Sequence, residues 1–270
     1  MIFISGLAFL GFVSATPWVA RHRLTSSAYQ ETFNDLVSKN YRLTYVSGYS
    51  YNYAPLFAAI WEQKSNSAWV ARHGMSGTEY QQQFDALVAK GYNPVLVNGY
   101  TVNGQPQYAA IWDNAPHPAW VARHGMTSQQ YQAEFNTYVS QGYKLKHVSG
   151  YAQGNTALYA AIWEKDTKNV PWVAHHGMSS ADYQNKFNQY TAKGYRPLLV
   201  GGYVVNGVDY YVAIWEKSSS GAWVARHGMT SDGYQQEFNN WVGQGYTLKV
   251  VSGYTLGLNQ DRYAALWYKE

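Results

Sequence analysis

Five histidines occur at equivalent places along the chain, and imidazole is the side chain best suited to bind a metal ion or to transfer a proton near neutral pH. They are His22, His73, His124, His176 and His227. A zinc site needs several ligands that converge on one ion, whereas these histidines lie 51 or 52 residues apart. We therefore expect no metal site, and we expect each imidazole to hydrogen-bond the backbone of its own segment.

A cation precedes each of these histidines, and a carboxylate recurs further along. The cations are Arg21, Arg72, Arg123 and Arg226, with His175 in the fourth place. The carboxylates are Glu62, Asp113, Glu164 and Glu216, with Tyr268 in the fifth place. Catalysis by paired carboxylates needs two acids in one pocket, and each segment supplies only one recurrent acid. The pattern instead predicts ion pairs between these arginines and these carboxylates across neighbouring segments.

Serine offers no better nucleophile. Ser47, Ser149 and Ser252 share a Val-Ser-Gly sequence, but Asn98 and Gly201 stand at the corresponding places elsewhere. A position that accepts Ser, Asn and Gly is typical of a turn that needs a particular backbone conformation. The sequence contains no Gly-x-Ser-x-Gly, no phosphate-binding loop and no His-Glu-x-x-His. We predict a protein that is not an enzyme and that holds no cofactor.

The elements that carry these residues are repeated five times. Trp-Val-Ala occurs at Trp18, Trp69, Trp120, Trp172 and Trp223. A second tryptophan ends an Ala-Ile-Trp or Ala-Leu-Trp run at Trp61, Trp112, Trp163, Trp215 and Trp267. A fixed period of this length is the sequence signature of a repeat protein. We predict units at about residues 18–68, 69–119, 120–171, 172–222 and 223–270.

Each unit has the pattern β-α-β-β. The Trp-Val-Ala-Arg-His-Gly segment predicts a short strand. Ser76 with Glu79 three residues later predicts a capping box at the start of a helix, and Gly91 predicts the end of that helix. Two strands follow, and the Asn-Gly pairs at Asn103 and Asn206 predict hairpin turns between them.

One unit cannot bury its own apolar faces, so neighbouring units must stack. An open stack needs polar caps, yet the first and last units keep nearly the full aromatic pattern. We therefore predict an α+β repeat protein whose five units close into a five-fold pseudosymmetric, propeller-like toroid. It forms a single domain over residues 16–270. An open α/β solenoid is the alternative.

The composition excludes several classes of protein. Apolar residues make up 46% of the chain, enough to fill a core, so we do not expect disorder. The net charge is +4, but the lysines and arginines are scattered and form no basic run. We therefore expect no nucleic-acid partner. The absence of cysteine excludes disulfides and thiolate metal sites.

Residues 1–15 are apolar and end in Val13-Ser14-Ala15, which is similar to a signal-peptidase site. The stretch is too short to span a bilayer. We predict that it is a signal peptide and that the protein is secreted, without a stable membrane span. The alternative is a strand that packs against the last unit.

The repeated signature resembles the tandem structural repeat of the polyglycine hydrolase family, also known as the bacterial tandem repeat domain. It consists of Trp-Val-Ala-Arg-His-Gly-Met-Ser/Thr, then Tyr-Gln-x-x-Phe, Val-Ser-Gly-Tyr and Tyr-Ala-Ala-Ile-Trp, and it covers residues 18–270. The resemblance implies a secreted repeat module that accompanies a serine-hydrolase domain with a Ser-x-x-Lys motif. That motif is missing here, so we do not expect the hydrolase activity.

We predict a secreted, lectin-like protein that binds carbohydrate or cell-surface ligands in aromatic-rich clefts between units. Five equivalent clefts would raise a weak single-site affinity through multivalency. The alternative is a protein-binding or inhibitory module related to the accessory repeat domain of secreted serine hydrolases. The predicted ligand-binding residues are Tyr51, Tyr53, Asn103, Gln105, Gln153, Asn155, Asn206, Asp209, Arg72, Arg123 and Arg226.

Overall fold

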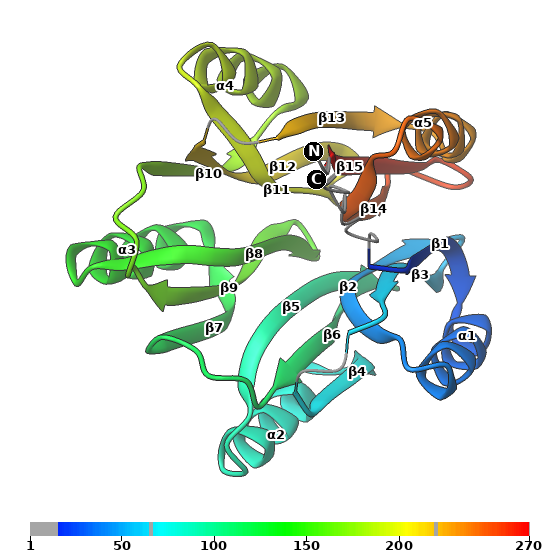
Figure 1. Cartoon of the computed structure of the whole chain (residues 1–270), viewed down its shortest axis with the longest axis horizontal. Coiled ribbons are helices and arrows are strands. Elements are labelled where there is room, and N and C mark those ends of the chain that lie inside the picture. The colour runs from blue at the N-terminus through cyan, green and yellow to red at the C-terminus, as the bar shows by residue number, and fades with distance from the viewer. Residues whose placement is uncertain (1–15, 65–66, 219–220, 270) are drawn as a thin grey trace, which may run out of the picture.

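The computed structural model describes residues 16–64, 67–218 and 221–269. Five consecutive β-α-β-β units account for these residues, as the sequence predicts. Their sheets lie around a common centre and their helices lie at the periphery (Figure 1). The signal peptide predicted at residues 1–15 lies outside the described residues.

Every unit contributes three strands and one helix. The first strands are β1 (Trp18–Thr25), β4 (Trp69–Met75), β7 (Trp120–Thr127), β10 (Trp172–Met178) and β13 (Ala222–Met229). The helices are α1 (Ser26–Ser38), α2 (Gly77–Val88), α3 (Ser128–Ser140), α4 (Ser180–Ala192) and α5 (Ser231–Gly243). The second strands are β2 (Arg42–Tyr51), β5 (Asn93–Val102), β8 (Tyr143–Gln153), β11 (Tyr195–Val205) and β14 (Thr247–Thr255). The third strands are β3 (Ala54–Glu62), β6 (Gln105–Asp113), β9 (Thr156–Lys165), β12 (Val208–Lys217) and β15 (Asp261–Lys269).

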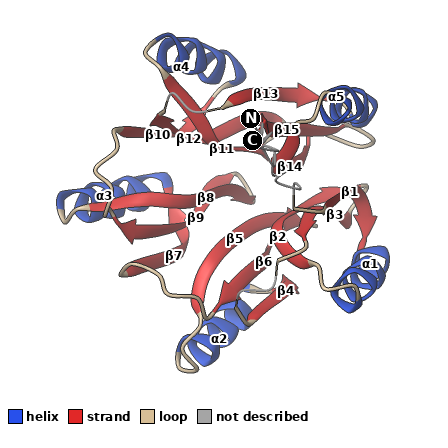
Figure 2. Ribbon diagram, in the orientation of Figure 1, coloured by secondary structure: helices blue, strands red, loops and turns tan. Residues whose placement is uncertain are grey.

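The third strand is the middle strand of each antiparallel sheet, between the first and the second. The second strands of neighbouring units pack on one another, and β14 of the fifth unit packs on β2 of the first. Each first strand therefore lies on the side of its sheet away from the centre, next to the helix (Figure 2). The described strands form five separate three-stranded sheets, and none of these sheets is closed into a barrel.

The helices begin and end where local chemistry requires. Ser76 and Glu79 form the predicted capping box, in which each side chain accepts a hydrogen bond from a backbone N–H of the first turn. The helix ends before Gly91, whose φ of 82° lies in the left-handed region that glycine adopts without strain. The predicted hairpin turns are also present, since Asn103 and Asn206 have φ values of 51° and 53°.

The hydrophobic core is divided among pairs of neighbouring units. Each of the five buried clusters combines residues of two consecutive units, and one cluster combines the fifth unit with the first. The second tryptophan of every unit lies in one of these clusters with no exposed surface. Because no cluster belongs to a single unit, the units stabilise one another and an isolated unit would leave part of its core uncovered.

A recurrent close contact between units joins a glycine of one second strand to a tyrosine ring of the next. A Cβ atom on Gly48 would lie 2.6 Å from the ring of Tyr100. The same contact occurs at Gly99 with Tyr151, Gly150 with Tyr203, Gly202 with Tyr254, and Gly253 with Tyr49. Only glycine leaves room for the ring at these places. The last of these contacts again joins the fifth unit to the first.

Gly48→Ala should therefore destabilise the protein. The added methyl overlaps the ring of Tyr100, and overpacking of this kind costs about 1–3 kcal/mol. Chemical denaturation of both proteins measures the difference in the free energy of unfolding. Gly243→Ala in α5 is the control, because no atom lies within 4 Å of its Cβ position. Equal stability of Gly48→Ala and the parent protein would contradict the proposed packing.

Candidate functional site

A similar cleft occurs between the helix of one unit and the first strand of the next. The cleft between the fifth and first units has a volume of about 270 Å³, and the one between the fourth and fifth about 540 Å³. Gln184 and Gln235 line these clefts from the helices, and Arg226 and Arg21 line them from the first strands. The two clefts are therefore lined by matching residue types.

Aromatic side chains form the wall of this cleft. The first tryptophan of each unit packs edge-on against the helix phenylalanine of the preceding unit, at centroid distances of 5.5 to 5.8 Å. These tryptophans are half-buried. Trp241 of α5 also lines the cleft between the fourth and fifth units. Its position on the apolar stripe of the helix predicts a core role, so its place at a cleft had no signal in the sequence.

The repeated histidines connect neighbouring units, which corrects the prediction that each bonds within its own segment. His73 packs edge-on against Tyr29 of the preceding helix at 4.6 Å, and the other four do the same at 4.6 to 4.8 Å. His176 Nε2 lies 2.9 Å from Ser128 Oγ at the start of that helix. Burial lowers the pKa of all five histidines, so they pack as neutral rings.

The recurrent arginines do not pair with the recurrent carboxylates. Arg226 Nε lies 3.0 Å from Glu237 of its own helix, and Arg123 Nε lies 3.5 Å from Glu134. The arginines and the acids recur with the same spacing in the sequence. In the structure, however, the two residues of each predicted pair lie on different parts of the sheet. The predicted arginine pairs between units are therefore wrong, and Arg21 and Arg226 border the clefts instead.

The carboxylates do pair between units, with cations that begin the second strands. Arg42 of the first unit binds Asp113 of the second, and Lys144 of the third binds Glu216 of the fourth. In the fifth unit Thr247 is too short at this place, and Lys249 reaches Glu62 of the first unit at 3.5 Å. Both acids of the first two units, Glu62 and Asp113, are 5% exposed. Ion pairs thus join the units as expected, although through other cations.

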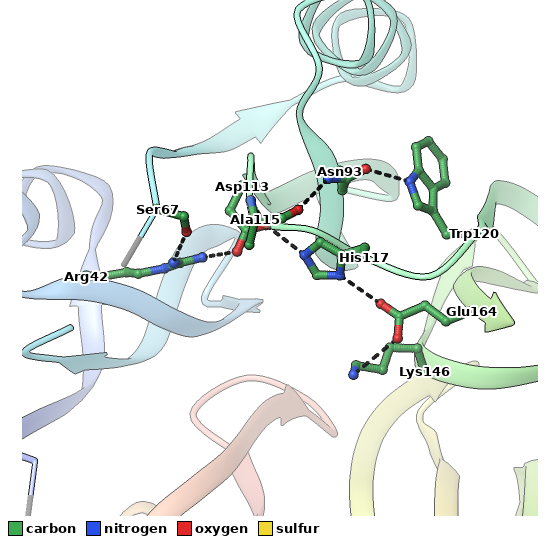
Figure 3. A network of polar contacts seen from close by, with 9 residues as sticks. All are labelled: Arg42, Ser67, Asn93, Asp113, Ala115, His117, Trp120, Lys146 and Glu164. Atoms are coloured by element: carbon green, nitrogen blue, oxygen red, sulfur yellow. Dashed lines mark hydrogen bonds and ion pairs between the residues drawn. The ribbon is translucent and has the colours of Figure 1, made fainter. Parts of the chain in front are cut away.

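His117 completes this network where the second unit has the short residue Asn93 (Figure 3). Its Nε2 lies 2.8 Å from Asp113 Oδ1, and its Nδ1 lies 3.1 Å from Glu164 Oε1 of the third unit. Asn93 itself accepts a hydrogen bond from Trp120 Nε1 at 2.8 Å. The imidazole therefore bridges two carboxylates of neighbouring units.

We expect His117→Ala to lower the free energy of unfolding by about 1–3 kcal/mol, because two partly buried carboxylates each lose a hydrogen-bond partner. Urea denaturation at pH 7 measures the change. Lys168→Ala, at an exposed site, is the control. A loss no larger than that of the control would show that the bridge contributes nothing to stability.

The predicted ligand residues fall into two separate groups. Arg72, Arg123 and Arg226 are exposed on first strands. The remaining residues lie at the hairpin turns between second and third strands or beside them: Tyr51, Tyr53, Asn103, Gln105, Gln153, Asn155, Asn206 and Asp209. The structure does not bring these two groups into one site, and their role in binding stays a prediction.

Several of the hairpin residues already have partners within the protein. Tyr51 Oη donates to Asn259 at 3.1 Å, and the guanidinium of Arg23 covers the Tyr51 ring at 4.5 Å. Asp209 Oδ2 accepts a hydrogen bond from Tyr211 at 2.8 Å. Tyr53 differs from these, because it is 68% exposed at the mouth of a central cavity.

The Val-Ser-Gly serines lie within second strands, so the predicted turn is wrong. Ser149 Oγ accepts a hydrogen bond from Gly99 N of the preceding unit at 3.0 Å, and Ser47 Oγ accepts one from Gly253 N at 3.1 Å. Asn98 plays the same part for Gly48 N at 2.7 Å. Ser and Asn therefore interchange because both supply an acceptor to the neighbouring unit.

Among the described residues, no group of three or more histidine or acidic side chains is placed to hold a metal ion. None of the described helices is long and apolar enough to cross a membrane.

His147 is the most strongly perturbed histidine. It is 6% exposed, and burial lowers its pKa to about 4, an effect that hydrogen bonding with the backbone of Val97 opposes and the charge of Lys146 assists. Between the unfolded value of 6.5 and about 4, the unfolded chain binds a proton that the folded chain does not. Stability from this group is therefore complete above pH 6.5 and is lost as the pH falls.

We expect acidification from pH 7.5 to pH 5 to cost about 2 kcal/mol through His147 alone. His147→Leu, which places the residue type of Leu96 and Leu199 there, should lose less stability over the same range. Urea denaturation at the two pH values gives both differences. An unchanged pH dependence in His147→Leu would disprove the assignment.

Comparison with known families gives one result. The family model described as polyglycine hydrolase-like, structural repeat, matches residues 15–64, 66–115, 117–166, 169–218 and 220–270. Each match contains one complete β-α-β-β unit of the structure. The resemblance predicted from the repeated signature is thereby confirmed.

Proposed function

The chain belongs to the polyglycine hydrolase-like structural repeat family, and from that premise we propose that it is a secreted, non-catalytic, lectin-like binding protein. Its carbohydrate ligands would occupy the clefts between the helix of one unit and the first strand of the next. The observation that carries the proposal is the recurrence of this cleft with the same residue types in different units.

The chemistry of the cleft suits a sugar. The half-buried tryptophan and the helix phenylalanine offer apolar surface for the C–H face of a sugar ring. The exposed side chains of Arg226 and Gln184 border the same cleft and can donate hydrogen bonds to hydroxyl groups. Gln184 is already oriented, because its Nε2 donates to Asn188 Oδ1 at 2.8 Å.

We further propose that the five units close into a propeller-like ring, so that five equivalent clefts face outward. Three kinds of contact between the fifth and first units support closure. Trp18 packs on Phe238 at 5.8 Å, Tyr49 Oη lies 2.5 Å from Tyr263 Oη, and Gly253 N donates to Ser47 Oγ. Each repeats a contact found between consecutive units. Secretion remains a proposal that rests on the signal-like sequence of residues 1–15.

A glycan array followed by calorimetry on any ligand found tests the binding function. We expect several ligands per chain, because the cleft is repeated. The double variant Arg226→Ala, Gln184→Ala removes the polar contacts of one cleft only, so the number of ligands per chain should fall by about one at unchanged affinity for the rest. Lys168→Ala is the matched surface control.

Absence of any glycan ligand at high protein concentration would contradict the lectin-like function. Capture of one secreted protein in a fixed ratio to this chain would favour the protein-binding or inhibitory module instead. A ligand bound with the same number per chain in the double variant would place the sites outside the clefts.

A further inference from the structure

A cavity of about 370 Å³ lies where the five second strands meet. Residues from β2, β5, β8, β11 and β14 line it together, and Tyr53 and Asn103 of two hairpin turns lie at its mouth. We call it the axial cavity. Its volume falls within the range of small-molecule sites. It is separate from the outer clefts, whose linings share no residue with it.

The axial cavity carries no formal charge at neutral pH. Among the described residues that line it there is no lysine, arginine, aspartate or glutamate. Its one imidazole, His147, is neutral because burial holds its pKa at about 4, and burial raises the pKa of Tyr45. A charged ligand would lose its hydration here without gaining a counter-charge, which is costly. The lining therefore selects an uncharged ligand.

The wall of the cavity is rigid. It consists largely of the glycine–tyrosine contacts between units, where the tyrosine ring fills the space next to the glycine Cα. The polar groups of the wall are mostly engaged: Asn98 accepts from Gly48 N, and Ser149 accepts from Gly99 N. A wall fixed in this way binds without first having to become ordered.

At one position of the second strands, the residue type differs among the five units. The equivalent positions in the five second strands are Tyr45, Leu96, His147, Leu199 and Val250. Three of these are aliphatic, whereas Tyr45 and His147 are polar and face each other edge-on at a centroid distance of 6.1 Å. Tyr45 also packs against three of the five core clusters.

The hydroxyl of Tyr45 has no hydrogen-bond partner in the part of the chain that the structure describes. The tyrosines of the Gly-Tyr contacts differ, since Tyr151 Oη lies 2.6 Å from Tyr108 Oη and accepts from Gly125 N. The Tyr45 side chain is half-buried, and a tyrosine hydroxyl in such a place normally hydrogen-bonds to protein, water or a ligand. Tyr45 lines the axial cavity, so a molecule in the cavity can supply that partner.

We propose that the axial cavity binds one small, uncharged molecule rich in hydroxyl groups, of the size of a mono- or disaccharide, with the Tyr45 hydroxyl as its hydrogen-bond partner. Tyrosine faces and glycine Cα–H groups supply the apolar contacts that such a molecule needs. This site is independent of the proposed outer clefts and takes one ligand per chain.

The test uses the whole chain and a panel of neutral mono- and disaccharides and polyols. NMR follows the ring signal of His147, assigned by its disappearance in His147→Leu, and calorimetry gives the number of ligands per chain. We expect the His147 signal to shift as one ligand per chain binds the axial cavity, in addition to any ligands in the outer clefts. Tyr45→Phe keeps the ring but removes the hydroxyl, and it should weaken binding by about tenfold. Lys168→Ala should bind as the parent protein does.

Two results would overturn the proposal. One is a panel in which no member shifts the His147 signal at millimolar concentration. The other is a ligand that binds Tyr45→Phe as tightly as the parent chain and whose number per chain falls in Arg226→Ala, Gln184→Ala, which would assign it to an outer cleft. A ligand with the opposite pattern supports the axial site even if the outer clefts bind nothing, so the two proposals fail separately.

Discussion

The close approach of a glycine in one second strand to a tyrosine ring in the next determines how the units assemble. Because a Cβ atom has no room there, the contact sets the distance between neighbouring second strands. The hydroxyl of the same tyrosine also forms hydrogen bonds, as that of Tyr151 does with the hydroxyl of Tyr108 and the backbone N–H of Gly125. The adjacent Ser or Asn accepts the glycine N–H. Burial and close packing thus act at one place in each unit, and hydrogen bonding joins them at four of the five junctions, because Gly201 supplies no side-chain acceptor for Gly150.

This contact explains why the core lies between units. The helix tyrosines, the histidines and the first tryptophans all meet aromatic residues of a neighbouring unit. Burial of the histidines keeps them neutral, and a neutral imidazole packs on a tyrosine ring at a lower desolvation cost than a charged one. The five-fold recurrence of histidine therefore reflects aromatic packing, which also makes the clefts alike.

The sequence predicts the interior of a unit better than its contacts with neighbours. Caps, helix ends and hairpins depend on residues a few positions apart, so Ser76 with Glu79 and Asn103 with Gly104 were sufficient. Residues that pair across units recur with the same spacing as many other residues. The spacing alone therefore does not identify which of them form a pair. The arginines and carboxylates illustrate this, because Asp113 binds Arg42 rather than Arg72. The axial cavity could not be predicted either, since it requires the second strands of all five units to meet.

The departures from five-fold repetition separate structure from function. Where Asn93 is too short to reach the next unit, His117 bridges the carboxylates, and Lys249 serves beside the short Thr247. Arg23 occupies a position with a φ of 56° that is glycine in the other units, and its side chain lies 3.6 Å from Asp261 and over Tyr51. In each case a second residue of the protein compensates for the departure. Among the described residues, the Tyr45 hydroxyl has no such partner, although apolar residues at three equivalent positions satisfy the same packing. A polar group that packing does not require, in a cavity lined by all five units, is therefore better explained by a ligand than by the fold.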